Sequence, residues 1–286
     1  MTDPFASPGH AADAYAPAEI AARVAATCIA KTRLNLLQTA TLGVLGGAFI
    51  AFGAMAYTLV VTDSALGFGP TRLVGGLAFS VGLILVIVGG AELFTGNNLL
   101  VMGWAEGCIG TRALLANWLV VYVANLVGAG ATAVLAWLAG VYALGDGAVG
   151  ATALGIAAGK VDLGFAEAFF RGLLCNVLVC LAVWLCFAAR DVTGKVLAIL
   201  FPVATFVALG FEHSVANMYA IPAGWLAAQE ATVIAHGGAA SGLSDRLDLA
   251  GFVANLVPVT LGNIVGGGGF VAFVYHLVYR RAARQG

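Results

Sequence analysis

Residues 210–217 have the sequence Gly-Phe-Glu-His-Ser-Val-Ala-Asn, which places a carboxylate, an imidazole and an amide inside a long apolar region. Such groups are expensive to bury in hydrocarbon unless they are paired. An ionisable residue in this setting is a hypothesis about a pathway for ions or protons. His213 is therefore the first candidate for a functional residue.

The composition of the chain requires a membrane around most of it. Of its 286 residues, 61% are hydrophobic and 9% are charged, so a globular interior of this length could not hide the apolar surface. A bilayer core about 30 Å thick needs a helix of roughly 20 residues, and the gaps between charges repeatedly leave that room. The net charge of −1 gives no indication of nucleic-acid binding.

Charged residues divide the chain into six predicted membrane spans. These cover residues 34–62, 73–91, 113–145, 172–189 with a few residues before it, 196–229 and 249–279, and Glu212 interrupts the fifth. An even number of spans puts both termini on one side of the membrane. Lys and Arg residues on that side outnumber those on the other by nine to three, so both termini are predicted to be cytoplasmic.

The segments outside the spans are short. Residues 1–33 are predicted to be a cytoplasmic tail in which Ile20, Val24 and Cys28 recur at helical spacing. This pattern indicates either a helix on the membrane surface or a solvated lead-in to the first span. Residues 225–248 are predicted to be an external loop, and residues 282–286 a cytoplasmic C-terminal tail.

Two parts of the chain repeat each other. Residues 90–97, Gly-Ala-Glu-Leu-Phe-Thr-Gly-Asn, align with residues 210–217 and pair Glu92 with Glu212. Asparagines eight residues apart also recur, at 117 and 125 and again at 255 and 263. Because each half has an odd number of spans, the repeats 34–145 and 146–281 must be inverted relative to each other. The sequence thus predicts an all-α membrane protein with broken second and fifth helices and a site near the midplane.

Five stretches resemble the formate/nitrite transporter family, and most of all its formate channels. They include Phe-Ser-Val-Gly-Leu at 79–83 and Glu-Leu-Phe-Thr-Gly at 92–96, and the others are residues 175–184, 206–218 and 255–267. The most specific string is Phe-Glu-His-Ser-x-Ala-Asn-Met at 211–218. The resemblance implies an aquaporin-like protomer in a homopentamer of the bacterial inner membrane, passing small anions such as formate or nitrite.

By matching motifs, the resemblance also implies roles for individual residues. Pore or substrate contacts are implied for His213, Thr95, Asn263 and, over the external mouth, Lys160. Apolar constrictions are implied for Phe79, Leu83, Leu93 and Phe94 on one side and for Phe206 and Val179 on the other. Supporting roles are implied for Glu92, Glu212 and Asn176. No cofactor and no metal is implied.

An anion in an apolar slot needs its hydration replaced or its charge removed. Lys160 and the helix N-termini at the breaks favour negative charge, and Thr95 and Asn263 can donate hydrogen bonds. His213 is the side chain in this region that is expected to exchange a proton near neutral pH. One hypothesis is that it protonates the anion, which makes transport pH-dependent. The other is that a neutral His213 only donates a hydrogen bond while the anion passes intact.

Other functions remain as alternatives. Nitrite, hydrosulfide and lactate compete with formate because selectivity among small ions depends on pore dimensions. A membrane-embedded enzyme could use His213 and Glu212 as acid and base, but no third partner or nucleotide loop accompanies them. The five cysteines lack metal-ligand spacing and are interpreted as small buried residues. A neutral-solute channel is the third class, although paired Asn-Pro-Ala boxes are missing from the sequence.

Overall fold

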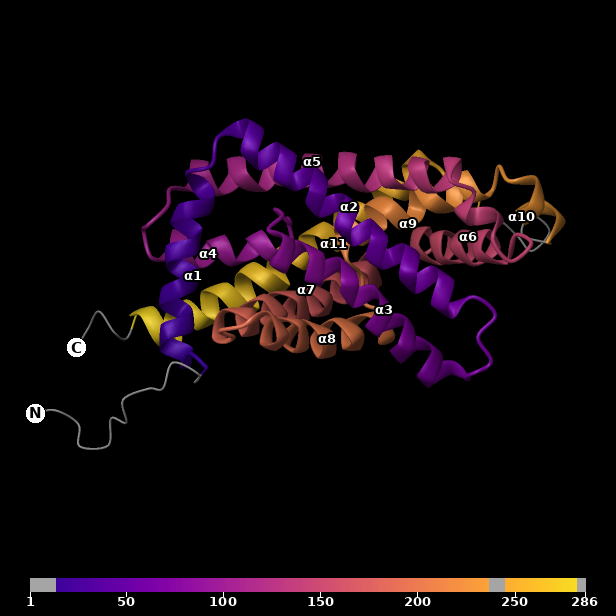
Figure 1. Ribbon diagram of the computed structural model, residues 1–286. Helices are drawn as coiled ribbons and strands as arrows, with labels where there is room; N and C mark the ends of the chain where they lie inside the picture. Colours follow the sequence, from indigo (N-terminus) through magenta and orange to yellow (C-terminus); the bar gives the residue numbers. More distant parts are fainter. Residues whose placement is uncertain (1–13, 237–244, 282–286) are drawn as a thin grey trace, which may run out of the picture.

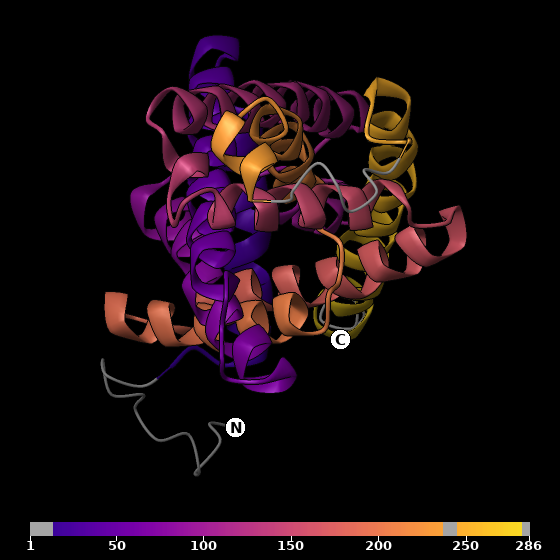
Figure 2. The ribbon, with the colours of Figure 1, turned by 90° about the vertical axis from the view of Figure 1, so that its right-hand side faces the viewer.

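A computed structural model of the chain describes residues 14–236 and 245–281, and this part of the chain contains helices and connecting turns. Predictions for residues 1–13, 237–244 and 282–286 lie outside the described residues. Figure 1 shows an elongated bundle with α1 at one end and α6 and α10 at the other. Figure 2 looks onto the latter end and shows the first helices (indigo) and the last (yellow) on opposite sides of the bundle.

Five described helices are long and apolar enough to cross a bilayer. They are α2 (Leu36–Val61), α3 (Phe68–Gly89), α5 (Thr111–Leu138), α7 (Phe165–Ala188) and the helix Leu249–Arg281 that starts as α11 (Leu249–Ile264) and continues as the π-helical η3 (Val265–Phe273) and η4 (His276–Arg281). The predicted fifth span forms two shorter helices, α8 (Val192–Ala208) and α9 (Ser214–Ala227). These lengths and compositions are those of an integral membrane protein.

Shorter helices complete the bundle. They are α1 (Pro17–Thr32), η1 (Gly96–Leu99), α4 (Leu100–Ala105), η2 (Val141–Ala143), α6 (Ala148–Val161) and α10 (Ala231–Ala235). The apolar face of α1, with Ile20, Val24 and Cys28, is buried against α4 and α7. The protein itself therefore covers the face that the sequence assigned to lipid or water. No helix was predicted for the α6 residues, which pack against α9.

The second span begins earlier than predicted, and the fourth includes the residues expected before 172, so in both a charged residue lies inside the helix. α3 starts at Phe68 and includes Arg72, whose guanidinium binds backbone carbonyls of α8. α7 starts at Phe165 and includes Arg171, which forms an i,i+4 ion pair with Glu167 at 2.5 Å. A charged side chain that has a partner inside the protein does not end a membrane helix.

Three smaller predictions were wrong. α5 ends at Leu138, well before residue 145, and Gly140 turns the chain with φ 72°. Trp225 belongs to α9 and donates its indole N–H to the carbonyl of Leu247 at 2.8 Å, so the loop predicted from residue 225 begins only after that helix. Cys108 is exposed, whereas the other four cysteines are buried.

Glycines bring α2 and α5 into direct backbone contact. A Cβ atom at Gly128 would lie 1.9 Å from the carbonyl oxygen of Val44, and one at Gly47 would lie 2.0 Å from that of Asn125. Such approaches are possible only without a side chain. In a membrane, helix association depends on close packing of this kind because lipid offers no hydrophobic driving force between helices.

The helices are interrupted at both of the matched strings. Gly90 directly follows α3 and Gly210 lies two residues after α8, and both have left-handed φ angles, of 83° and 72°. In each case the residue after the glycine donates its N–H to the carbonyl five residues earlier, at 2.9 Å and 3.0 Å. This is the Schellman arrangement, and glycine is the residue that adopts its left-handed position without strain.

Asn125 of α5 holds the first break. Its Oδ1 accepts the backbone N–H of Phe94 at 2.9 Å, and its Nδ2 donates to the carbonyls of Glu92 at 2.9 Å and Gly43 at 2.6 Å. One fully buried amide therefore replaces helical hydrogen bonds that the break has removed.

Asn263 of α11 makes the same contacts at the second break. Its Oδ1 accepts the N–H of Ser214 at 3.0 Å, and its Nδ2 donates to the carbonyls of Glu212 at 3.0 Å and Gly172 at 2.7 Å. This differs from the prediction that Asn263 donates to an anion, because both of its N–H groups are already bonded to the backbone. The repeated eight-residue spacing of the asparagines was the signal for this structural pair.

We expect Gly128→Ala to lower the thermal unfolding midpoint of the purified protein, because the added methyl group would overlap the carbonyl of Val44. Overpacking of this kind costs about 1–3 kcal/mol. Gly130→Ala is the matched control on the same helix, since nothing lies within 4 Å of a Cβ there. Equal losses from both variants would contradict the packing argument.

We expect Asn125→Ala and Asn263→Ala to lower the unfolding midpoint by similar amounts. Each change leaves buried backbone groups without partners, at a cost of about 1–3 kcal/mol per group. Asn35→Ala, at the exposed start of α2, is the control and should cost only about 1 kcal/mol. If Asn263→Ala altered transport but not stability, a ligand-binding role would replace the structural one.

Candidate functional site

Two cavities enter the bundle and approach each other along α3. The cavity under α1 has a volume of about 620 Å³ and reaches Leu83 and Leu93. The cavity beside α6 has a volume of about 480 Å³ and reaches Phe79 and Phe206. Phe79 and Leu83 are four residues apart on α3, a rise of about 6 Å. Only a short apolar stretch therefore lies between the two cavities.

The predicted constriction residues are all buried, but they do not all face a cavity. The rings of Phe79 and Phe206 meet edge to face with centroids 5.8 Å apart. Phe94 packs its ring against Tyr122 of α5, with centroids 4.9 Å apart, and lines neither cavity. Val179 is 2% exposed and also lines neither.

His213 is the N-cap of α9 and faces the break in the other half of the chain. Its Nδ1 accepts the backbone N–H of Ala216 at 3.0 Å, and its Nε2 lies 2.8 Å from Oγ1 of Thr95. Because a backbone N–H can only donate, Nδ1 carries no proton in this arrangement. The imidazole is therefore neutral with its proton on Nε2, where Thr95 accepts it.

Thr95 and His213 were both predicted to face the conduit, and the structure brings them into contact. The Phe206 ring is stacked near the imidazole, with centroids 6.1 Å apart. Asn176, predicted as a supporting residue, donates to the carbonyls of Thr95 at 3.2 Å and Asn263 at 2.7 Å. The loop that presents the Thr95 hydroxyl is thus fixed through its backbone.

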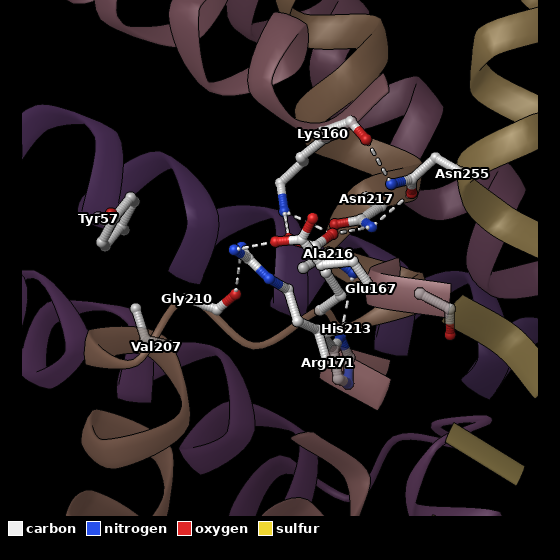
Figure 3. A network of polar contacts seen from close by, with 12 residues as sticks. Tyr57, Lys160, Glu167, Arg171, Val207, Gly210, His213, Ala216, Asn217 and Asn255 are labelled. Atoms are coloured by element: carbon white, nitrogen blue, oxygen red, sulfur yellow. Dashed lines mark hydrogen bonds and ion pairs between the residues drawn. The ribbon is translucent and has the colours of Figure 1, made fainter. Parts of the chain in front are cut away.

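Glu212 is the centre of a buried polar network (Figure 3). Lys160 donates to both carboxylate oxygens at 3.0 Å, and Asn217 donates to Oε2 at 2.6 Å and to Oδ1 of Asn255 at 2.7 Å. Asn255 in turn donates to the carbonyl of Lys160 at 2.8 Å. Lys160, which was predicted to lie over the external mouth, lines the cavity beside α6, and Glu212 balances its charge.

Glu92 has the same surroundings at the other break. Lys31 of α1 donates to its Oε1 at 2.5 Å, and Asn97 donates to its Oε2 at 2.6 Å and to Asn117 at 2.9 Å. Sequence reasoning missed Lys31 as the counterpart of Lys160. The repeat offered a signal, since a lysine precedes the glutamate by 61 residues in one half and by 52 in the other.

Both cavities carry more positive than negative side chains. The cavity under α1 is lined by Arg23, Lys31, Arg190 and Lys195 against Glu92. The cavity beside α6 is lined by Arg72, Lys160 and Arg171 against Glu212. Clefts lined by one sign of charge concentrate ions of the opposite sign. Both mouths therefore favour anions, and in the described ranges no three potential metal ligands come together.

Comparisons with known proteins agree with this geometry. Residues 18–277 match the family model described as formate/nitrite transporter. The formate channel FocA of Escherichia coli strain K12 is 40% identical over 274 residues, which cover 94% of this chain and 96% of that protein. A probable formate transporter of Methanothermobacter thermautotrophicus is 41% identical over 280 residues, which cover 92% of this chain and 96% of that protein.

Solved structures show the same likeness in three dimensions. A structure described as a pentameric formate channel with formate bound has 39% identity and a TM-score of 0.78, covering 85% of this chain and 97% of that one. A structure described as an FNT family ion channel has 31% identity and a TM-score of 0.79, covering 91% of this chain and 98% of that one. The chain belongs to the formate/nitrite transporter family.

Proposed function

We propose that this protein is a membrane channel for small monovalent anions, with formate as its main substrate. The observation that carries the proposal is the buried Thr95–His213 contact behind the cavity beside α6. The Nε2–H of His213 is a neutral donor that lies close to the apolar side chains of Phe79 and Phe206. Both mouths carry an excess of positive charge. The formate channels among the relatives support formate as the substrate.

The assembly and orientation belong to the same proposal. The pentameric relative supports a homopentamer in which each chain carries its own pathway. The excess of Lys and Arg on the side of the tails supports cytoplasmic termini in a bacterial inner membrane. The asparagine and glutamate contacts repeat at both breaks, which supports six spans arranged as the inverted repeats 34–145 and 146–281.

In this mechanism the basic mouths attract anions, and the apolar side chains around Phe79 and Phe206 remove their hydration water. Formate then accepts the Nε2–H of His213 in place of Thr95, which replaces part of the lost hydration. For His213 to give up that proton, Nδ1 must first take one and break its bond to Ala216. The neutral hydrogen-bond donor is therefore the better supported of the two hypotheses. Protonation of Nδ1 at acid pH removes the cap of α9 and makes passage pH-dependent.

The first test compares solutes in proteoliposomes. We expect formate to cause rapid swelling or internal pH change, while glycerol flux stays at the level of protein-free liposomes, because the mouths select for negative charge. Nitrite and hydrosulfide serve as competing substrates in the same assay. Faster entry of glycerol than of formate would contradict an anion channel.

The second test separates the capping role of His213 from its titration. We expect His213→Ala to reduce formate flux on the order of tenfold and to destabilise the protein, because it removes both a donor and an N-cap. His213→Asn supplies a strong N-cap without a titrating ring, so it should keep the unfolding midpoint and lose the pH dependence of flux that protonation of Nδ1 causes. The same pH profile in the Asn variant as in the unmodified protein would rule out His213 as its origin.

A further inference from the structure

Arg72 joins three helices at the mouth beside α6. From the start of α3, its Nε donates to the carbonyl of Ala208 at 3.0 Å and its Nη2 to that of Val207 at 3.3 Å, both at the end of α8. Its Nη1 donates to the hydroxyl of Tyr57 on α2 at 3.1 Å. A planar guanidinium can satisfy these three directions together, which a lysine ammonium cannot do with the same geometry.

The contact continues along one face of α3. Arg72, Gly76, Phe79 and Leu83 are spaced by four, three and four residues, which places them on the same face of a helix. A Cβ atom at Gly76 would lie 2.6 Å from the carbonyl oxygen of Ala204, so α3 and α8 touch through their backbones there. The helix that carries Phe79 is thus fastened to α8 at two successive turns.

The last carbonyls of a helix lack the usual partners within it. At the end of α8 the carbonyl of Val207 accepts the N–H of Gly210 at 3.0 Å together with Nη2 of Arg72, and the carbonyl of Ala208 accepts Nε of Arg72. Val207 and Ala208 directly follow Phe206, whose aromatic side chain packs edge to face against that of Phe79. A cation at a helix C-terminus is also favourable for the helix dipole. Arg72 therefore fixes the turn of α8 that presents Phe206.

We infer that Arg72 is a positioning residue that sets the gap between Phe79 and Phe206, and with it the size limit for monocarboxylates. The inference rests on the proposed anion channel. Arg72 precedes Phe79 by seven residues, about 10 Å along α3. It therefore acts through α8 and not by contact with an anion that lies between Phe79 and Phe206. Loss of the guanidinium lets the end of α8 move and admits an anion with one more methyl group.

The experiment measures formate and acetate flux into proteoliposomes of the full-length protein, after subtraction of the flux into protein-free liposomes. Arg72→Gln should raise the ratio of acetate to formate flux on the order of tenfold, as one methyl group is worth in an apolar pocket. Arg72→Lys keeps the charge but loses the planar guanidinium, and it should shift the acetate-to-formate flux ratio in the same direction. Tyr57→Phe removes one of the three contacts and should give a smaller shift.

Arg171→Gln is the matched control for charge. Arg171 lines the same mouth and donates to the carbonyl of Gly210 at 3.3 Å, but it makes no contact with the two carbonyls that follow Phe206. Figure 3 shows its guanidinium beside Gly210. Its loss should change the rates for both anions alike and leave the ratio unchanged.

Two outcomes would overturn the inference. One is that Arg72→Gln has the same acetate-to-formate flux ratio as the unmodified protein, while the unmodified protein conducts formate. The other is a ratio in Arg72→Lys equal to that of the unmodified protein, which would make Arg72 a simple charge at the mouth. If Arg72→Gln does not assemble, as judged by size-exclusion chromatography, Arg72→Lys and Tyr57→Phe decide. Absence of formate flux in the unmodified protein would instead overturn the proposed function.

Discussion

Backbone groups that leave a helix inside hydrocarbon must find partners within the protein, and the rest of this structure depends on that constraint. Each break leaves N–H and carbonyl groups without their helical partners. Asn125 and Asn263 supply the missing partners, each from a neighbouring long helix. Because these amides fix the unwound segments, Thr95 and His213 can meet across the bundle at 2.8 Å.

The two buried glutamates obey the same constraint in electrostatic form. A carboxylate in a low-dielectric interior is tolerated only when a partner and further hydrogen bonds compensate for its lost hydration. Glu92 and Glu212 each have a lysine and an asparagine in contact. The lysines come from α1 and α6, the helices at opposite ends of the bundle (Figure 1). Each lysine thus attaches an end helix to a break, and the positive excess of the mouths comes from the remaining basic residues.

The sequence predicted much of this architecture because the relevant signals are local. Glycine followed by a polar string indicates a helix end, and apolar length indicates a span, so both breaks could be foreseen, and with them the segments that carry Thr95 and His213. Partners distant in sequence could not. Arg72 was taken as the limit of a span because nothing local shows that its charge is satisfied 136 residues away by Ala208. For the same reason Asn263 was assigned to a ligand, although packing gives both of its N–H groups to the backbone.

Corresponding asparagines and glutamates make the same polar contacts at the two breaks, and this bears on the direction of transport. In the proposed channel, an ion that enters from either end would meet a basic mouth, then a lysine–glutamate pair, then apolar side chains before the centre. An energy profile that is nearly the same from both ends gives little rectification, so net movement follows the difference in electrochemical potential across the membrane. Export and import are then two regimes of one conduit. Any preference for one of them originates where the two halves differ: in α1, which covers only one of the mouths, and at the site itself, where Leu93 stands in the place of His213.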